Sequence, residues 1–237
     1  MRNFVDEERV ARGARMGKIA TFGGLGLLIA GFVISLAIKQ PAMIWVSFAC
    51  LIGGLMVSSI GTYNMNRWVR EPRGDQALAQ ALKGRDDRYQ LYNYFLPAPH
   101  VLLSPKGLYV LTALGQEGTI QFDGEKFRRN FSLLRLLRFM AEEGMGKPLA
   151  QGDAEVDSLR QFLEANDASE GVEIQNILVF YSPRAELQVS NAPRPITVPK
   201  GLKKTLRKLP DGGLAEGQYE RLEDLFDEEA GLEIEWV

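Results

Sequence analysis

The sequence predicts an α/β protein in which an N-terminal transmembrane helical hairpin is followed by a domain with a mixed β-sheet. Two long uncharged apolar runs lie close together near the start of the chain. Helix-type and strand-type patterns alternate after residue 67, and no low-complexity linker or internal repeat interrupts them. This later region has about 170 residues, which is enough for one domain with its own core.

The two apolar runs cover residues 19–38 and 41–66, between Lys18, Lys39 and Arg67. A helix needs about 20 residues to cross a bilayer core about 30 Å thick, so both runs are long enough. A signal peptide is the main alternative for the first run, but a second apolar run follows at once and no small-residue cleavage site precedes a polar mature sequence. Buried helices of a soluble protein are the other alternative. Hydropathy favours transmembrane helices, which we expect at residues 19–38 and 42–65.

Basic residues flank the hairpin on its outer sides and predict its orientation. Only Lys39 lies in the turn. The positive-inside rule then places both termini and the main domain in the cytoplasm, with the hairpin in the inner (plasma) membrane. We expect Trp45, Tyr63 and Trp68 at the membrane–water interfaces. The flanking basic residues are Arg2, Arg9, Arg12, Arg15 and Lys18 before the first run, and Arg67, Arg70 and Arg73 after the second.

Small residues recur four positions apart in both runs. They are Cys50, Gly54 and Ser58 in the second run, and Gly26 and Ala30 in the first. Such spacing lets two helices approach closely. We expect these residues to pack the hairpin on itself rather than on a second copy.

We expect four segments: a cytoplasmic lead (1–18), the hairpin (19–66), an α/β domain (67–215) and an acidic C-terminal tail (216–237). The only cysteine, Cys50, lies inside the second run, so the chain forms no intramolecular disulfide, as suits a reducing compartment. The only histidine is His100, which excludes a multi-histidine zinc site. A net charge of −2 makes no general case for nucleic-acid binding.

Local patterns place the elements of the domain in order. Apolar spacing predicts a helix over residues 75–83, and aromatic residues favour a strand over 89–95. The turn signal Ser104-Pro105-Lys106-Gly107 joins expected strands at 101–103 and 108–114 into a hairpin, and a third strand covers 119–122. Residues 172–181 are almost continuously apolar, as in a buried central strand. Helices are expected at residues 127–140, 154–165, 205–209 and 218–229.

Several pieces of residues 74–151 together resemble the nuclease-related domain (NERD) family, which has the restriction-endonuclease-like fold. They are Gly74-Asp75 opening a helix, His100 through Gly107 in the hairpin, Leu108-Tyr-Val-Leu111, Gly118-Thr-Ile120, and Lys147-Pro-Leu-Ala-Gln151 before a helix. The resemblance covers about half of the chain, and its order and spacings agree. The strand at residues 172–181 suits the later core strand of that fold.

The resemblance implies a Mg²⁺-dependent phosphodiesterase site whose catalytic positions are mostly lost here. The family supplies acids on the helix, before the histidine and on the second hairpin strand, with a lysine two residues after the last acid. Such carboxylates hold Mg²⁺, which activates water. The corresponding residues here are Asp75, Pro99, Thr112 and Leu114. We therefore expect no catalytic residue, no metal and no cofactor, and Asp75 then serves only the helix dipole.

Displaced groups are the alternative to a lost site. Glu117 and Asp123 lie just beyond the hairpin, and Lys106 lies in its turn. In a nuclease with displaced ligands, these residues would have to replace the missing acids and lysine from positions that differ from those of the family. His100 is expected to pack in the hairpin rather than to act as an acid or base.

Two basic segments are candidate binding surfaces. Residues 127–140 read as a basic amphipathic helix carrying Arg128, Arg135 and Arg138, which suits anionic lipid or an ordinary surface helix. The second segment has no aromatic residue for base stacking, so lipid phosphate or a solvated face is favoured over nucleic acid. The acidic tail is expected to pair with it internally or to meet a partner. The second segment carries Lys200, Lys203, Lys204, Arg207 and Lys208.

Three functions follow as hypotheses. The first is a membrane-anchored, non-catalytic binding or scaffolding module with an unidentified protein partner. The second is a membrane-tethered Mg²⁺ nuclease with displaced ligands. The third is a nucleic-acid-binding module that has lost cleavage.

Overall fold

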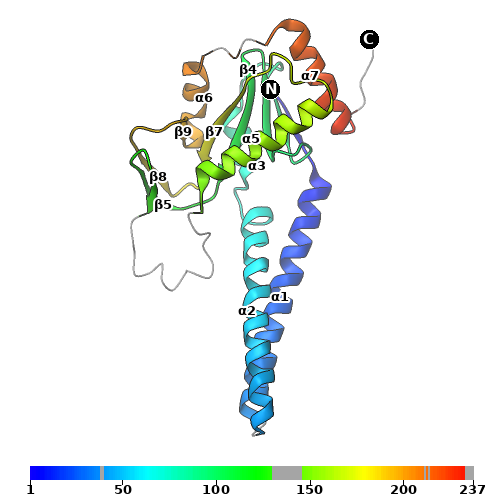
Figure 1. Cartoon of the computed structure of the whole chain (residues 1–237), viewed down its shortest axis with the longest axis vertical. Coiled ribbons are helices and arrows are strands. Elements are labelled where there is room, and N and C mark those ends of the chain that lie inside the picture. The colour runs from blue at the N-terminus through cyan, green and yellow to red at the C-terminus, as the bar shows by residue number, and fades with distance from the viewer. Residues whose placement is uncertain (38–39, 130–145, 211, 213, 233–237) are drawn as a thin grey trace. The chain divides into compact units, whose positions relative to one another are not determined.

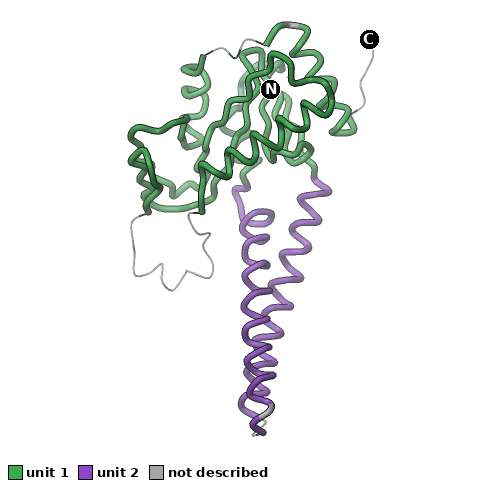
Figure 2. Tube along the Cα trace, in the orientation of Figure 1, with its two compact units in different colours: residues 1–6, 74–131, 144–237 green, residues 7–73, 132–143 purple. Residues whose placement is uncertain are grey.

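The computed structural model describes residues 1–37, 40–129, 146–210, 212 and 214–232. These residues form two compact units (Figure 2). Residues 7–73 belong to a helical unit, and the first six residues join the later part of the chain in a sheet-containing unit. The result is the expected mixed α/β architecture with two apolar N-terminal helices (Figure 1).

The helical unit consists of α1, Glu7–Ala37, and α2, Pro41–Trp68. Both helices are long and apolar enough to be candidate membrane spans. Only 11% of the most apolar window of each helix is buried, which argues against core helices of a soluble protein. Large side chains such as Phe22 and Trp45 are 71% and 78% exposed, as lipid-facing residues would be.

The two helices meet along a seam of small residues that repeats every seven positions. On α1 the buried glycines are Gly17, Gly24 and Gly31. A Cβ atom on Gly24 would lie 2.5 Å from the backbone nitrogen of Ser58, so only glycine permits this approach. Ser47 on α2 donates a hydrogen bond of 2.8 Å to the Gly31 carbonyl across the seam. A seven-residue period is typical of left-handed helix pairs.

The small-residue prediction is right for α2 and wrong for α1. Gly54 and Ser58 lie at the seam beside Gly24, and Cys50 contacts Gly31. A Cβ atom on Gly26 would meet nothing within 4 Å, so this glycine faces away from α2. The hairpin therefore packs on itself as expected, through glycines seven apart rather than through the Gly26 face.

The open end of the hairpin carries polar contacts. The Arg67 guanidinium lies 5.0 Å from the centroid of the Trp68 ring and donates a 3.0 Å hydrogen bond to the Tyr63 hydroxyl. Arg73 and Glu7 form an ion pair at 4.0 Å. Because α1 begins twelve residues before Ile19, it extends about 18 Å beyond its apolar run.

The sheet-containing unit is built on a six-stranded mixed sheet of order β1-β2-β3-β4-β7-β9. β2, β3 and β4 are antiparallel neighbours, whereas β1, β7 and β9 each pair in parallel with the strand beside them. The strands are β1 Arg2–Val5, β2 Gln90–Asn93, β3 His100–Ser104, β4 Gly107–Leu114, β7 Ile174–Phe180 and β9 Ile196–Thr197. A second sheet, of order β6-β5-β8, contains β5 Gly118–Phe122, β6 Phe127–Arg129 and β8 Ala185–Val189.

Helices cover both faces of the larger sheet. On one face, α3 (Gly74–Leu82) and α6 (Pro199–Lys208) bury Leu78, Leu202 and Leu206 against Tyr109 and Leu111. On the other face, α5 (Pro148–Ala165) and α7 (Glu216–Glu229) pack apolar side chains against the alternate residues of the same strands. The buried residues of this second layer include Leu159, Leu163, Leu222 and Phe226 from the helices and Val101 and Val110 from the sheet.

Most predicted elements of the domain are confirmed within two residues, including the Ser104–Gly107 turn and the central strand at residues 174–180. The helices expected at residues 154–165 and 205–209 instead begin six residues earlier, at Pro148 and Pro199. Three further findings differ from the expectations. Residues 1–18 are not a separate segment: Arg2–Val5 form a strand of the large sheet and α1 begins at Glu7. Residues 127–129 form a strand and not the start of a helix, and the rest of that expected helix lies outside the described residues.

The third correction concerns the acidic segment. α7 is part of the core and not a tail, because Leu222 and Phe226 are 1% and 0% exposed. Its inner acids also bond to the sheet: the Tyr92 hydroxyl donates to Asp227 Oδ1 at 2.6 Å, and Arg2 pairs with Glu223 at 3.3 Å. Burial and the Asp227 hydrogen bond raise the pKa of Tyr92 far above its ordinary value, so this hydroxyl stays protonated in the folded protein.

We expect Gly24→Ala to weaken the hairpin, because its new Cβ atom meets the α2 backbone at 2.5 Å and the helices must separate. The expected loss is about 1–3 kcal/mol of unfolding free energy, the usual cost of overpacking a close contact. Gly26→Ala is the matched control and should leave stability unchanged or raise it by up to about 1 kcal/mol, because alanine is the better helix former. Denaturant titration of the full chain in mild detergent measures both, and equal effects would contradict the seam.

Candidate functional site

Asp75 lies at the start of α3 in a buried polar cluster. It is 2% exposed, and the Tyr94 hydroxyl donates to its Oδ1 at 3.3 Å. The Tyr94 ring packs edge-on against His100, with ring centroids 4.9 Å apart. His100 Nδ1 in turn lies 2.8 Å from Asn93 Oδ1. As expected, His100 is a packed, hydrogen-bonded hairpin residue, and Asp75 also suits the positive end of the α3 dipole.

Asp75 belongs to the α3 face of the sheet. A Cβ atom on Gly74, its neighbour, would lie 3.1 Å from Ala113 Cβ and 3.3 Å from His100 Nε2. Leu78 of the same helix packs on Leu111. Because side chains alternate along a strand, Leu111 and Ala113 face α3 while Thr112 and Leu114 face the opposite layer.

Thr112 sits in a second polar cluster on that opposite face. It is fully buried and donates a 2.6 Å hydrogen bond to Glu155 Oε2 on α5. Asn176 on β7 donates to the Thr112 hydroxyl at 2.9 Å and to the Val110 carbonyl at 3.1 Å. The other oxygen of Glu155 accepts a 2.9 Å hydrogen bond from Gln151. Both carboxylate oxygens of Glu155 are therefore engaged by neutral donors of the chain itself.

Arg194 completes this cluster. Its Nη1 donates to Asn176 Oδ1 at 3.0 Å, and its Nη2 forms a short ion pair with Asp153 of α5. A Cβ atom on Gly152 would lie 2.4 Å from Asn176 Oδ1, so α5 approaches β7 this closely only because residue 152 is glycine. We call these residues the Thr112 network: Thr112, Gln151, Asp153, Glu155, Asn176 and Arg194.

The two remaining family positions supply no metal ligand. Pro99 precedes β3 and, if the β3–β4 register continues, stands opposite Thr112. Its carbonyl accepts a 2.8 Å hydrogen bond from the Tyr94 backbone amide. Leu114 is 3% exposed and packs in an apolar cluster with Ile120 and Phe180. The lysine position of the family is thus occupied by a core side chain.

The structure does not bring the four positions together. Asp75 lies in the α3 layer, whereas Thr112 and Leu114 face the α5 layer, where Glu155 is the carboxylate beside Thr112. Within the described ranges, no three His, Cys, Asp or Glu side chains lie close enough to hold a metal ion. Glu155 is the residue that sequence reasoning missed, and its position on α5, after Gln151 in the Lys147–Gln151 motif, was the available signal.

The displaced candidates have other partners. Glu117 pairs with Arg184 at 3.4 Å. Asp123 accepts hydrogen bonds from the backbone amides of Lys126 and Glu125, which lower the pKa of its carboxyl, and it pairs with Arg128 at 3.5 Å. Arg128 lies on β6, and the other two arginines of that segment, Arg135 and Arg138, lie outside the described residues.

The second basic segment forms helix α6. Lys200, Lys204, Arg207 and Lys208 are exposed on its outer side, opposite the buried Leu202 and Leu206. Lys203 instead turns inward and bonds to the Lys83 carbonyl at the end of α3. The expected internal pairing with the acidic segment is wrong, because α6 and α7 lie on opposite faces of the sheet (Figure 1).

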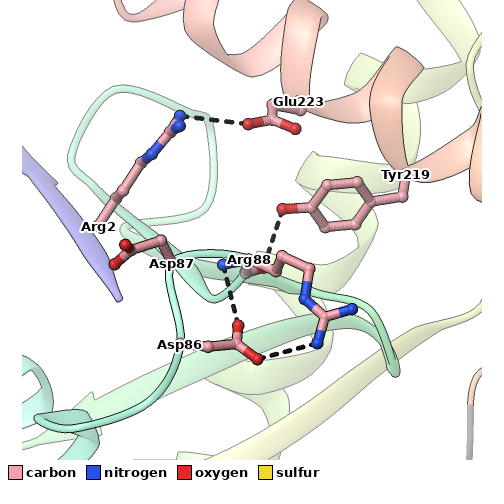
Figure 3. A pocket seen from close by; sticks show the side chains of 6 residues that line it. All are labelled: Arg2, Asp86, Asp87, Arg88, Tyr219 and Glu223. Carbon is pink, nitrogen blue, oxygen red and sulfur yellow. Dashed lines mark hydrogen bonds and ion pairs between the residues drawn. The ribbon is translucent and has the colours of Figure 1, made fainter.

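A surface cavity of about 390 Å³ lies beside β1 (Figure 3). Its charges are already paired with each other or with the chain terminus: Arg2 with Glu223 at 3.3 Å, Arg88 with Asp86 at 3.0 Å, and Asp87 with the Met1 ammonium at 2.8 Å. The hydrogen bond from Arg88 lowers the pKa of Asp86. A charged ligand would have to break these pairs, so this cavity is a weaker candidate than the Thr112 network.

Comparison with known proteins finds one similarity, which covers most of the residues in these clusters. The family model of the nuclease-related domain (NERD) matches residues 70–181, from just before α3 to just after β7. Neither a curated protein nor a solved structure gives a match. The matched segment includes Asp75, Pro99, Thr112 and Leu114, and also Glu155.

The geometry predicts which acid a restored metal site would use. In the double variant Pro99→Asp with Thr112→Glu, the new carboxylates should face α5 beside Glu155, and three carboxylates can share Mg²⁺ or Mn²⁺. We expect Mn²⁺ to raise the thermal unfolding midpoint of this variant by several degrees, since a ligand that binds only the folded state stabilises it. The unmodified chain should show no such rise.

Two further substitutions in that background test which face of the sheet supplies the third metal ligand. Glu155→Gln should abolish the rise in midpoint, whereas Asp75→Ala should leave it intact. A metal response that survives Glu155→Gln but disappears with Asp75→Ala would contradict the placement described here. Calorimetric scans with and without Mn²⁺ measure all four proteins.

Proposed function

We propose that this chain, whose residues 70–181 match the nuclease-related domain, is a membrane-anchored binding module that does not cleave nucleic acid. Three family positions carry proline, threonine and leucine, which offer no carboxylate or ammonium group. The observation that carries the proposal is the Thr112 network. Each carboxylate oxygen of Glu155, the acid beside Thr112, accepts a hydrogen bond from within the chain, from Thr112 or from Gln151.

The charge pattern of the network supports the same conclusion. Two-metal phosphodiester hydrolysis needs several carboxylates that converge on one point and a cation near the scissile phosphate. Here Glu155 accepts hydrogen bonds from Thr112 and Gln151, and Asp153 forms an ion pair with Arg194, so both acids already have partners within the chain. Such a network stabilises the contact between α5 and β7, which is a structural role.

Anchoring follows from the two candidate spans. β1 and β2 belong to one sheet, so the chain before α1 and the chain after α2 must lie on the same side of a membrane that the hairpin crosses twice. The excess of arginine and lysine at these ends favours the cytoplasmic side of the inner membrane.

The absence of cleavage is tested on the full chain in detergent micelles, because β1 belongs to the sheet and a fragment from residue 67 would lack it. We expect no cleavage of single- or double-stranded DNA or RNA with Mg²⁺ or Mn²⁺ above the level of a Glu155→Gln control. Metal-dependent cleavage that Glu155→Gln removes would establish the displaced-ligand nuclease instead.

The orientation is tested without an N-terminal fusion, since the Met1 ammonium bonds to Asp87 and the Arg85 carbonyl. In a Cys50→Ser background, Gln40→Cys in the turn should react with an impermeant maleimide added outside intact cells. Glu164→Cys, at an exposed position of α5 in the domain, should react only after lysis. The reverse labelling pattern would contradict a cytoplasmic domain.

A further inference from the structure

Two exposed charged stripes of opposite sign have the same spacing. On α6, Lys200, Lys204 and Lys208 follow one another at intervals of four residues and are all exposed. On α7, Glu220, Asp224 and Glu228 do the same. Residues four apart lie on one side of a helix, so each set forms a continuous stripe that is slightly inclined to its helix axis.

The stripes are not paired within one chain. Among the described residues, none of these six side chains forms a hydrogen bond or ion pair, whereas the inward-facing Glu223 and Asp227 are bonded to Arg2 and Tyr92. The two helices also pack in different layers of the domain, one with Leu111 and the other with Val110. The sheet therefore stands between a basic stripe and an acidic stripe that complement each other.

We infer that the α6 stripe of one copy binds the α7 stripe of a second copy in the same membrane. The inference rests on the anchoring part of the proposed function and not on the absence of catalysis. Copies inserted in the same orientation present both stripes on the same side of the membrane. Each exposed ion pair contributes little alone, but confinement to one membrane raises the effective concentration of the partner.

The symmetry of this contact determines the kind of assembly. Because the two surfaces differ, the contact is heterologous, and a copy bound through α6 keeps its own α7 stripe free for another copy. The expected product is a row or ring of domains rather than a closed two-fold dimer. Exposed pairs are screened by salt over about 8 Å at physiological ionic strength, so the assembly should dissociate as salt increases.

Two competing ligands of the basic stripe are anionic lipid and nucleic acid. The α6 stripe has no aromatic side chain between its lysines on which bases could stack. Lipid phosphate would bind the basic stripe on α6, but it would not bind the acidic stripe on α7. The shared spacing of the two stripes favours a partner that carries both, and a second copy is such a partner.

The test is energy transfer between labelled full-length copies reconstituted in vesicles of neutral phosphatidylcholine. One variant carries Lys200→Glu, Lys204→Glu and Lys208→Glu, and the other carries Glu220→Lys, Asp224→Lys and Glu228→Lys. The unmodified chain should give transfer that falls to the random-encounter level in 0.5 M salt, and each variant alone should show only that level. Mixing the two variants should restore transfer, since each then meets a stripe of opposite charge.

A matched control separates stripe pairing from net charge. The variant with Glu125→Lys, Glu164→Lys and Glu170→Lys changes three other exposed acids by the same total charge and should associate like the unmodified chain. Association of either stripe variant alone at the unmodified level, or no recovery in the mixture, overturns the inference. Association that requires anionic lipid or added nucleic acid also overturns it. Failure to insert into vesicles is seen by flotation before the energy-transfer measurement and would count against the anchoring itself.

Discussion

The alternation of side chains along β4 is the constraint on which the rest of the domain depends. This strand is paired with β3 on one side and β7 on the other, so its register is fixed from both edges. Tyr109 and Leu111 are thereby committed to the layer of α3 and α6, and Val110 and Thr112 to the layer of α5 and α7. A shift of one residue would exchange every contact between the two layers.

The dependence of the sheet on pairing between distant strands also explains which elements could be predicted from the sequence and which could not. Local signals located the hairpin turn, β4, β7 and α3, because apolar period and turn residues are properties of short segments. β1 was missed because four residues beginning with Arg2 carry no strand signal of their own and depend on β2, which is remote in sequence. The acidic composition of α7 hid Leu222 and Phe226, which fix it to the core.

In the candidate site, too, some features could be predicted from the sequence and others could not. The loss of acids at Pro99 and Thr112 was evident from the resemblance, since it concerns residue identity. The face on which each position lies was not evident, because it depends on which helix covers which side of the sheet. Glu155 meets Thr112 only through the packing of α5 on β7, which Gly152 permits. The order of motifs along the chain does not predict such packing, because it depends on contacts between residues that are distant in sequence.

The first strand has a consequence for the order of folding. The Met1 ammonium and Asp87 are 86 positions apart in the chain, a separation that makes closure of the sheet edge entropically costly and slow. Most of that separation is taken up by the hairpin, whose two ends approach each other where Gly13 meets Trp68 and Glu7 meets Arg73. Pairing of α1 with α2 therefore shortens the loop that β1 must close to the segment between Trp68 and Gln90, together with Asp6. Pairing of the two candidate spans should therefore precede completion of the sheet, because it brings β1 close to the strand that it joins.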